Sequence, residues 1–182
     1  MLMQNDGPVI WYILHTITYN IEYKQATILE KNILLLCLKY FANIIPCNKC
    51  KKFYYYLYKN YNPINNIFYN KTIDWGISIH NTVNLKLNKP IKEKEYVDNI
   101  YKNKNIDNDK IINFLIKNLY SNRINILDTI KFITCFQYLY PDDKLKLKFI
   151  MINNKSSLLS KSNKFKYREE LINKYREILI IK

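Results

Sequence analysis

Two cysteines separated by two residues, Cys47 and Cys50, are the side chains in this sequence that are best suited to chemistry. At the start of a helix such a pair can close a small disulfide. The helix N-terminus, together with Lys49, Lys51 and Lys52, also favours a thiolate over a thiol. The pair is therefore a candidate redox centre. Two thiols at this spacing can equally be half of a zinc site, so the rest of the chain has to decide between the two interpretations.

A helix that begins at Gly7-Pro8 places an aromatic ring and an imidazole on one face. Proline is tolerated at an early helical position, and Trp11 and His15 then follow four residues apart. These two rings could clasp one flat ligand. Taken alone, however, they are better explained as a core aromatic and a core histidine.

A second helix, predicted around residue 75 and stopped by Pro90, carries an imidazole and carboxamides. His80, Asn84 and Leu87 fall on one predicted buried face, with Asn81 at its border. Because an unpaired buried polar group costs about 1–3 kcal/mol, these side chains need partners. A bound heteroaromatic ring with nitrogens and carbonyls would supply them.

The remaining apolar periodicity also predicts helices, over 27–41, 47–58, 110–119, 126–140, 144–152 and 166–180. A turn-rich linker is expected over 60–70, a charged stretch over 91–108 and a loop over 156–162, with Pro141-Asp142-Asp143 as a start signal. Cys37 and Cys135 lie within two of these helices. Buried, unreactive thiols are the expected roles for both.

Composition excludes several classes of protein. With two glycines in 182 residues, a glycine-rich phosphate loop is excluded, so any nucleotide must be held by side chains. The net charge of +14 raises the alternative of a nucleic-acid-binding protein, but the lysines are spread over all segments instead of forming a stripe.

A zinc-stabilised module would use Cys47, Cys50 and either His80 or Cys37, and the usual further ligand pair is absent. No signal peptide or membrane-spanning run is predicted.

In order and spacing, three stretches together resemble the Erv/ALR family of FAD-linked sulfhydryl (thiol) oxidases. They are Gly7-Pro8-Val9-Ile10-Trp11-Tyr12-Ile13-Leu14-His15-Thr16, then Pro46-Cys47-Asn48-Lys49-Cys50, then Trp75 with His80-Asn81-Thr82-Val83-Asn84 and Leu87-Asn88-Lys89-Pro90. The resemblance implies an all-α fold, a four- to five-helix FAD-binding bundle over residues 1–105, followed by a C-terminal helical extension over 106–182. A chain ending near Asn105 is then expected to fold and to oxidise a small dithiol.

The resemblance also implies the site. Cys47 and Cys50 would be catalytic, with Cys47 exchanging with the substrate and Cys50 lying against the flavin. No metal is expected. The residues implied to bind FAD are Gly7, Trp11, His15, Cys50, His80, Asn81, Val83, Asn84, Lys86, Lys89 and Tyr101.

As further consequences, the resemblance implies protein dithiol substrates, O2 as the electron acceptor with H2O2 as product, and a homodimer. A thioredoxin-like protein could act as a carrier, whereas membrane and nucleic acid are not expected as partners. The length and the extension are most similar to the oxidases of large DNA viruses of eukaryotes, which implies the host cytoplasm or the virion as the location.

Overall fold

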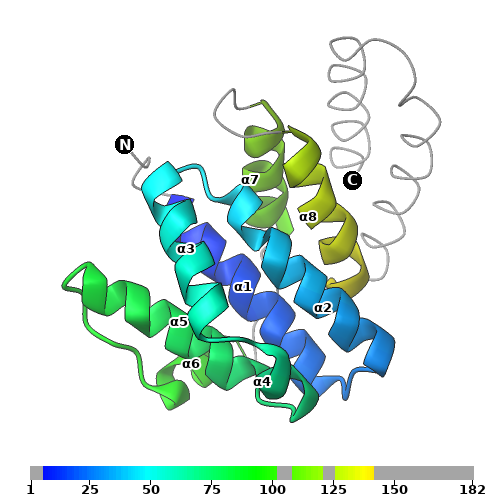
Figure 1. Ribbon diagram of the computed structural model, residues 1–182, viewed down its shortest axis with the longest axis vertical. Helices are drawn as coiled ribbons and strands as arrows, with labels where there is room; N and C mark the ends of the chain where they lie inside the picture. Colours follow the sequence, from blue (N-terminus) through cyan, green and yellow to red (C-terminus); the bar gives the residue numbers. More distant parts are fainter. Residues whose placement is uncertain (1–5, 102–107, 121–125, 142–182) are drawn as a thin grey trace.

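The computed structural model describes residues 6–101, 108–120 and 126–141, and every regular element within these ranges is a helix (Figure 1). The predicted all-α class is therefore confirmed. The helices predicted over 144–152 and 166–180 and the loop over 156–162 lie outside the described residues. The described elements are α1 (Asp6–Tyr23), α2 (Ile28–Phe41), the 3-10 helix η1 (Ala42–Ile44), α3 (Asn48–Asn60), α4 (Ile64–Phe68), α5 (Thr72–Lys86), α6 (Lys94–Tyr101), α7 (Asn108–Tyr120) and α8 (Ile126–Leu139).

Two short helices fall where the periodicity of the sequence predicted none. In the expected linker, α4 follows Pro63, and Asn62 Oδ1 accepts a hydrogen bond from the Ile64 N–H at 3.0 Å. Ile67 anchors this turn in the core. In the charged stretch, α6 is held by Val97, which is also buried. Helices this short depend on tertiary contacts, and each has too few turns to show a clear periodicity in the sequence.

Local signals set the start of α2. Thr27 and Glu30 form a capping box in which Thr27 Oγ1 accepts from the Glu30 N–H and the Glu30 carboxylate accepts from the Thr27 N–H. Gln25, just before it, has a positive φ of 50°, which turns the chain out of α1. The first two helices can therefore fold back on each other over a short connection.

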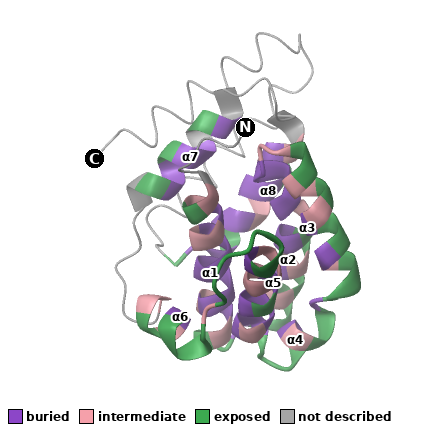
Figure 2. Ribbon diagram, turned by 90° about the vertical axis from the view of Figure 1, so that its left-hand side faces the viewer, coloured by how far each residue is buried: buried purple, intermediate pink, exposed green. Residues whose placement is uncertain are grey.

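One hydrophobic core runs through the bundle, and α1 is its central helix. α1 contacts α2, α5, α6, α7 and α8, and its apolar side chains Ile13, Leu14 and Ile17 are fully buried. Figure 2 shows the buried side of the helices turned toward one another, with the exposed residues on the outside. Since α1 carries the predicted Trp11 and His15, the core also fixes the orientation of these two rings.

The core does not end at the boundary predicted near residue 105. α8 packs along α2, and Phe132 of α8 meets Phe41 of α2 edge to face, with ring centroids 5.9 Å apart. Cys37 and Leu38 of α2 are completely buried in the same cluster. The division into two units stays a prediction, and removing α8 is expected to expose this face of α2.

A substitution in α8 tests this shared core. Replacing Phe132, which is fully buried, with alanine should lower the free energy of unfolding of the full chain by about 3–5 kcal/mol. Tyr138→Ala on the exposed side of the same helix is the matched control and should change it by about 0.5 kcal/mol or less. Urea unfolding followed by circular dichroism measures both. Equal, small effects would show that α8 contributes little to the folded core.

Candidate active site

The Cys47–Cys50 pair forms a disulfide across the first turn of α3, with the two Cα atoms 5.2 Å apart. Cys47 is the N-cap residue, in an extended conformation, and its Sγ accepts a hydrogen bond from the Cys50 N–H at 3.2 Å. Sulfur thus takes the place of the oxygen that usually caps a helix. After reduction, the same N–H and the helix dipole would stabilise negative charge on Cys47 Sγ.

The two cysteines differ in their surroundings. Both are half-buried, and Cys50 packs against the hydrophobic core together with Phe53. Cys47 is not among the core contacts and stands at the helix end, where Asn48 and Lys49 are exposed. A reagent from solvent therefore has its more direct approach to Cys47.

A close contact between α1 and α5 positions the predicted ring residues. Gly76 of α5 faces Thr18 of α1, where a Cβ atom would lie 3.2 Å from Thr18 Oγ1 and 3.7 Å from His15 Nδ1. The first distance is shorter than an ordinary van der Waals contact. The absence of a side chain at Gly76 therefore lets α1 and α5 approach each other at the level of His15.

Across this contact, Trp11, His15 and His80 form one cluster. A hydrogen bond of 3.0 Å joins His15 Nε2 and His80 Nδ1. Trp11 stacks on His80 with ring centroids 4.1 Å apart and an angle of 12° between the planes, and the Tyr101 ring lies 4.8 Å from His15. The structure thus brings together four residues that the resemblance singled out. Trp11 and His80 are in direct contact, so no ring lies between them.

Both imidazoles are neutral at pH 7. Burial, followed by the nearby His80, lowers the pKa of His15 to about 3. Burial, followed by Lys92 and Lys89, lowers the pKa of His80 to about 4. One ring therefore donates and the other accepts in the bond between them. Within the described residues, His15 Nδ1 is the one buried side-chain nitrogen or oxygen that has no hydrogen-bond partner.

The amides of α5 have different surroundings. The side chain of Asn81 makes two hydrogen bonds to the backbone of Lys92, donating at 2.9 Å and accepting at 2.8 Å, and so holds the segment after α5 in place. Asn84 is buried, and Val83 packs against the core. Leu87 was expected on the same buried face, and that expectation is wrong because α5 ends at Lys86 and Leu87 is 57% exposed.

The other predicted cofactor residues lie around this cluster. Lys86 Nζ is 3.5 Å from the centroid of the Phe53 ring and so joins the end of α5 to the start of α3. Lys89 is exposed. Gly7 lies at the start of α1, and a Cβ there would meet no atom within 4 Å, so the protein itself does not require glycine at this position.

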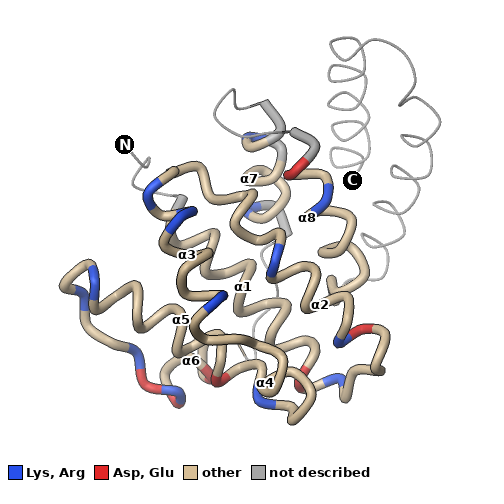
Figure 3. The backbone as a smooth tube through the Cα atoms, in the orientation of Figure 1, with Lys and Arg blue, Asp and Glu red and all other residues tan. Residues whose placement is uncertain are grey.

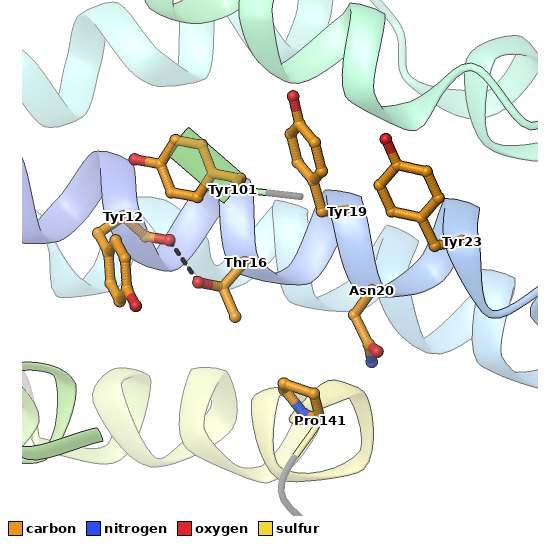
Figure 4. Close-up of a pocket in the computed structure, with 7 residues that line it drawn as sticks. All are labelled: Tyr12, Thr16, Tyr19, Asn20, Tyr23, Tyr101 and Pro141. Carbon is orange, nitrogen blue, oxygen red and sulfur yellow. Dashed lines mark hydrogen bonds between the residues drawn. The ribbon is translucent and has the colours of Figure 1, made fainter. Parts of the chain in front are cut away.

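Sequence reasoning missed a pocket of about 180 Å³ beside the ring cluster (Figure 4). Its lining consists of Tyr12, Thr16, Tyr19, Asn20, Tyr23, Tyr101 and Pro141. Tyr12, Thr16, Tyr19 and Tyr23 of α1 recur at helical spacing. This signal was available in the sequence but was hidden by the abundance of tyrosine. Burial, followed by a hydrogen bond that the hydroxyl donates to Asp98, raises the pKa of Tyr19. The pocket is large enough for a single ring.

The remaining two cysteines are outside this arrangement. Cys37 is fully buried on α2, and burial raises the pKa of its thiol well above the ordinary value, with a smaller effect of Cys135. Burial also raises the pKa of Cys135. Both are therefore poor nucleophiles. Within the described ranges, no three His, Cys, Asp or Glu side chains are grouped so that they could hold a metal ion, and no helix is long and apolar enough to cross a membrane.

These features define a class: helical proteins that carry a dithiol–disulfide pair at a helix start and a cluster of rings around a buried histidine. The comparison with family profiles then gives the particular family. Residues 8–104, more than half of the chain, match the Erv1 / Alr family, and the chain belongs to that family. No curated protein and no solved structure matches the sequence.

The neutral histidine pair predicts how stability depends on pH. Because the pKa of His15 is lower in the folded chain than the ordinary 6.5, the unfolded chain binds the proton first. Stability is then complete above about pH 6.5 and falls as the pH decreases, by up to about 1.4 kcal/mol per pH unit for one such histidine. Urea unfolding between pH 7 and 5, above the range where carboxylates titrate, measures this slope.

The variant His15→Gln separates this effect from other titrations. The chain contains only two histidines, so the slope between pH 7 and 5 should become smaller in the variant even if its stability at pH 7 is also reduced. An unchanged slope would show that His15 is not held neutral by the fold.

Proposed function

We propose that the protein is an FAD-linked sulfhydryl oxidase that forms disulfides in protein dithiols and passes the electrons to O2. The observation that carries this proposal is the Cys47–Cys50 disulfide at the start of α3, within the residues that match the family and joined to α5 through Phe53 and Lys86. Membership of the family supports the activity.

The residues of the ring cluster fit a flavin nucleotide. His15 Nδ1 is buried and without a partner, so a ligand atom that bonds it would remove a cost of about 1–3 kcal/mol. The indole of Trp11 is half-buried and offers a face for stacking, while His80, which covers its other side, is only partly buried. Trp11, His15, His80, Asn84 and Tyr101 are the residues that we propose hold the adenine and the adjoining parts of FAD.

The charges of the nucleotide would have partners at the same end of α5. Lys86 and Lys89 are exposed there and could neutralise phosphate groups, which suits a chain without a glycine-rich loop. Asn81 and Val83 could support FAD binding indirectly. Asn81 holds the segment after α5 in place, and Val83 packs that helix against the core. When bound, FAD would accept an electron pair from the cysteines and deliver it to O2, which gives H2O2.

The cysteines of the chain have separate tasks in this proposal. Cys47 receives the attack of a substrate thiolate on its Sγ, the Cys47–Cys50 bond breaks and Cys50 leaves as a thiolate. The Cys50 N–H and the helix N-terminus stabilise negative charge at this turn. The packing of Cys50 against the core supports Cys47 as the sulfur that the substrate attacks.

Several finer features follow from the resemblance alone and belong to the same proposal. The protein would act like the oxidases of large DNA viruses, in the host cytoplasm or in the virion. It would form a homodimer, and a thioredoxin-like carrier would be one of its substrates. The extension over 106–182, from which α8 packs on α2, would then also serve partner binding or assembly. Light scattering on the purified chain distinguishes a dimer from a monomer.

The first test of the function is the colour and activity of the purified protein. It should be yellow with noncovalent FAD and should consume O2 when dithiothreitol is added. Trp11→Ala should lose most of the flavin because the stacking face is gone, whereas Tyr69→Ala, which removes an aromatic side chain that is 74% exposed, should keep it. A folded protein that stays colourless after incubation with FAD would contradict the proposal.

A second test assigns the cysteine roles without any need for flavin. Cys50→Ser leaves the Cys47 thiol at the helix end, and Cys47→Ser leaves the Cys50 thiol against the core. The first variant should react with an aromatic disulfide reagent about tenfold faster or more, because access and the helix N-terminus both favour Cys47. Absorbance of the released thiol gives the two rates. The reverse order of rates would reverse the two assignments.

A further inference from the structure

The surface around the disulfide is basic, and its charges are not compensated. Beginning directly after Cys47, α3 contains no acidic residue and four lysines: Lys49, Lys51, Lys52 and Lys59. Lys86 from α5 reaches the same surface through its contact with Phe53. Among the described residues, none of these lysines takes part in an ion pair. Because Lys86 is assigned to the phosphates of FAD in the proposed function, we call Lys49, Lys51 and Lys52 the basic collar of the disulfide.

The described acidic side chains lie away from the start of α3. Figure 3 shows them near the end of α1 and at the starts of α2, α5, α6 and α8, whereas lysines mark the start of α3 and the end of α5. Glu30, Asp74 and Asp128 are each paired with a lysine. Asp128 is the one that influences α3, at Tyr55, and its charge is offset by its own partner Lys131. None of the described acidic side chains therefore forms an ion pair with the collar.

We propose that the basic collar selects acidic dithiols, so that the preferred substrates of Cys47–Cys50 are proteins or segments whose cysteines are flanked by Asp or Glu. This inference rests on the proposed function and names its substrate class. Lys49 and Lys51 are two and four residues from Cys47, well inside the distance of about 10 Å over which charges act at 0.1 M salt. Such a field raises the rate of encounter with an oppositely charged partner.

The exchange itself is balanced within the protein and its substrate. A substrate thiolate attacks Cys47 Sγ, a mixed disulfide forms and Cys50 leaves as a thiolate. The second substrate thiolate then attacks the substrate sulfur of that mixed disulfide and releases Cys47. The substrate is oxidised by two electrons, the Cys47–Cys50 disulfide is reduced by two, and the two substrate protons pass to solvent or to the released thiolates. The field of the collar acts on the approach of the substrate and on the charge of the mixed disulfide.

The experiment measures reduction of Cys47–Cys50 in the full chain by two dithiol peptides in single-turnover mixing without O2. The peptides share one sequence except that the cysteines are flanked by glutamates in one and by lysines in the other. Each rate is divided by that peptide's rate with the uncharged hydroxyethyl disulfide, which removes differences in thiol pKa. The wild-type protein should prefer the acidic peptide by about tenfold at low salt, and the preference should fall toward one at about 1 M salt.

Charge variants locate the effect. Lys49→Glu combined with Lys52→Glu should abolish or reverse the preference, and the milder pair Lys49→Gln with Lys52→Gln should reduce it. Lys59→Glu is the control at the other end of α3 and changes the net charge by the same amount as the glutamine pair. It should lower the preference much less, since Lys59 is twelve residues from Cys47. Circular dichroism verifies that each variant is folded.

The outcomes separate this inference from the proposed function. If dithiothreitol reduces the disulfide and the wild type shows no preference between the peptides, the basic collar is not a substrate-selecting surface and the oxidase proposal stands. If Lys59→Glu lowers the preference as much as Lys49→Gln combined with Lys52→Gln, which changes the net charge equally, net charge and not the collar is responsible, and this also overturns the inference. If dithiothreitol itself fails to reduce Cys47–Cys50, the oxidase proposal fails.

Discussion

The close approach of α1 and α5 at Gly76 is the contact on which the candidate site depends. At this level Thr18 Oγ1 would lie only 3.2 Å from a Cβ, and the His15–His80 hydrogen bond forms beside it. A side chain at Gly76 would require the Thr18 side chain to move by a few tenths of an ångström, beside the ring of His15. Of the two glycines in the chain, this is the one whose missing side chain the fold itself uses.

The helix α5 also connects the ring cluster to the disulfide. His80, in the middle of the helix, belongs to the rings, and Lys86, at its end, covers Phe53 one turn after Cys50. The ring cluster is dry enough to keep both histidines neutral, whereas the disulfide lies at a half-exposed helix end among lysines. The proposed oxidase activity requires such an arrangement, in which substrate proteins reach the disulfide and not the region proposed to hold the cofactor.

Local sequence signals predicted much of this. The cysteine spacing after Pro46 identified a helix that starts at the pair, and helical periodicity found α1, α2, α5 and α8 to within a few residues. The prediction that Leu87 is buried was wrong because helical periodicity does not show that α5 ends at Lys86. The direct stacking of Trp11 on His80 and the packing of Phe132 on Phe41 join residues far apart in the sequence, so no local pattern could reveal them. The tyrosine pocket was hidden by a composition in which tyrosine is common everywhere.

The central claim is that Cys47–Cys50 transfers electrons from a dithiol to a flavin held by the ring cluster, and anaerobic reduction tests it most directly. The absorbance of bound FAD is recorded while dithiothreitol is added in the absence of O2. The flavin of the wild type should be bleached rapidly, whereas the flavin of the Cys47→Ser and Cys50→Ser variants should remain oxidised over the same time. Bleaching at the wild-type rate in both variants would contradict the account, because the flavin would then be reduced without the disulfide.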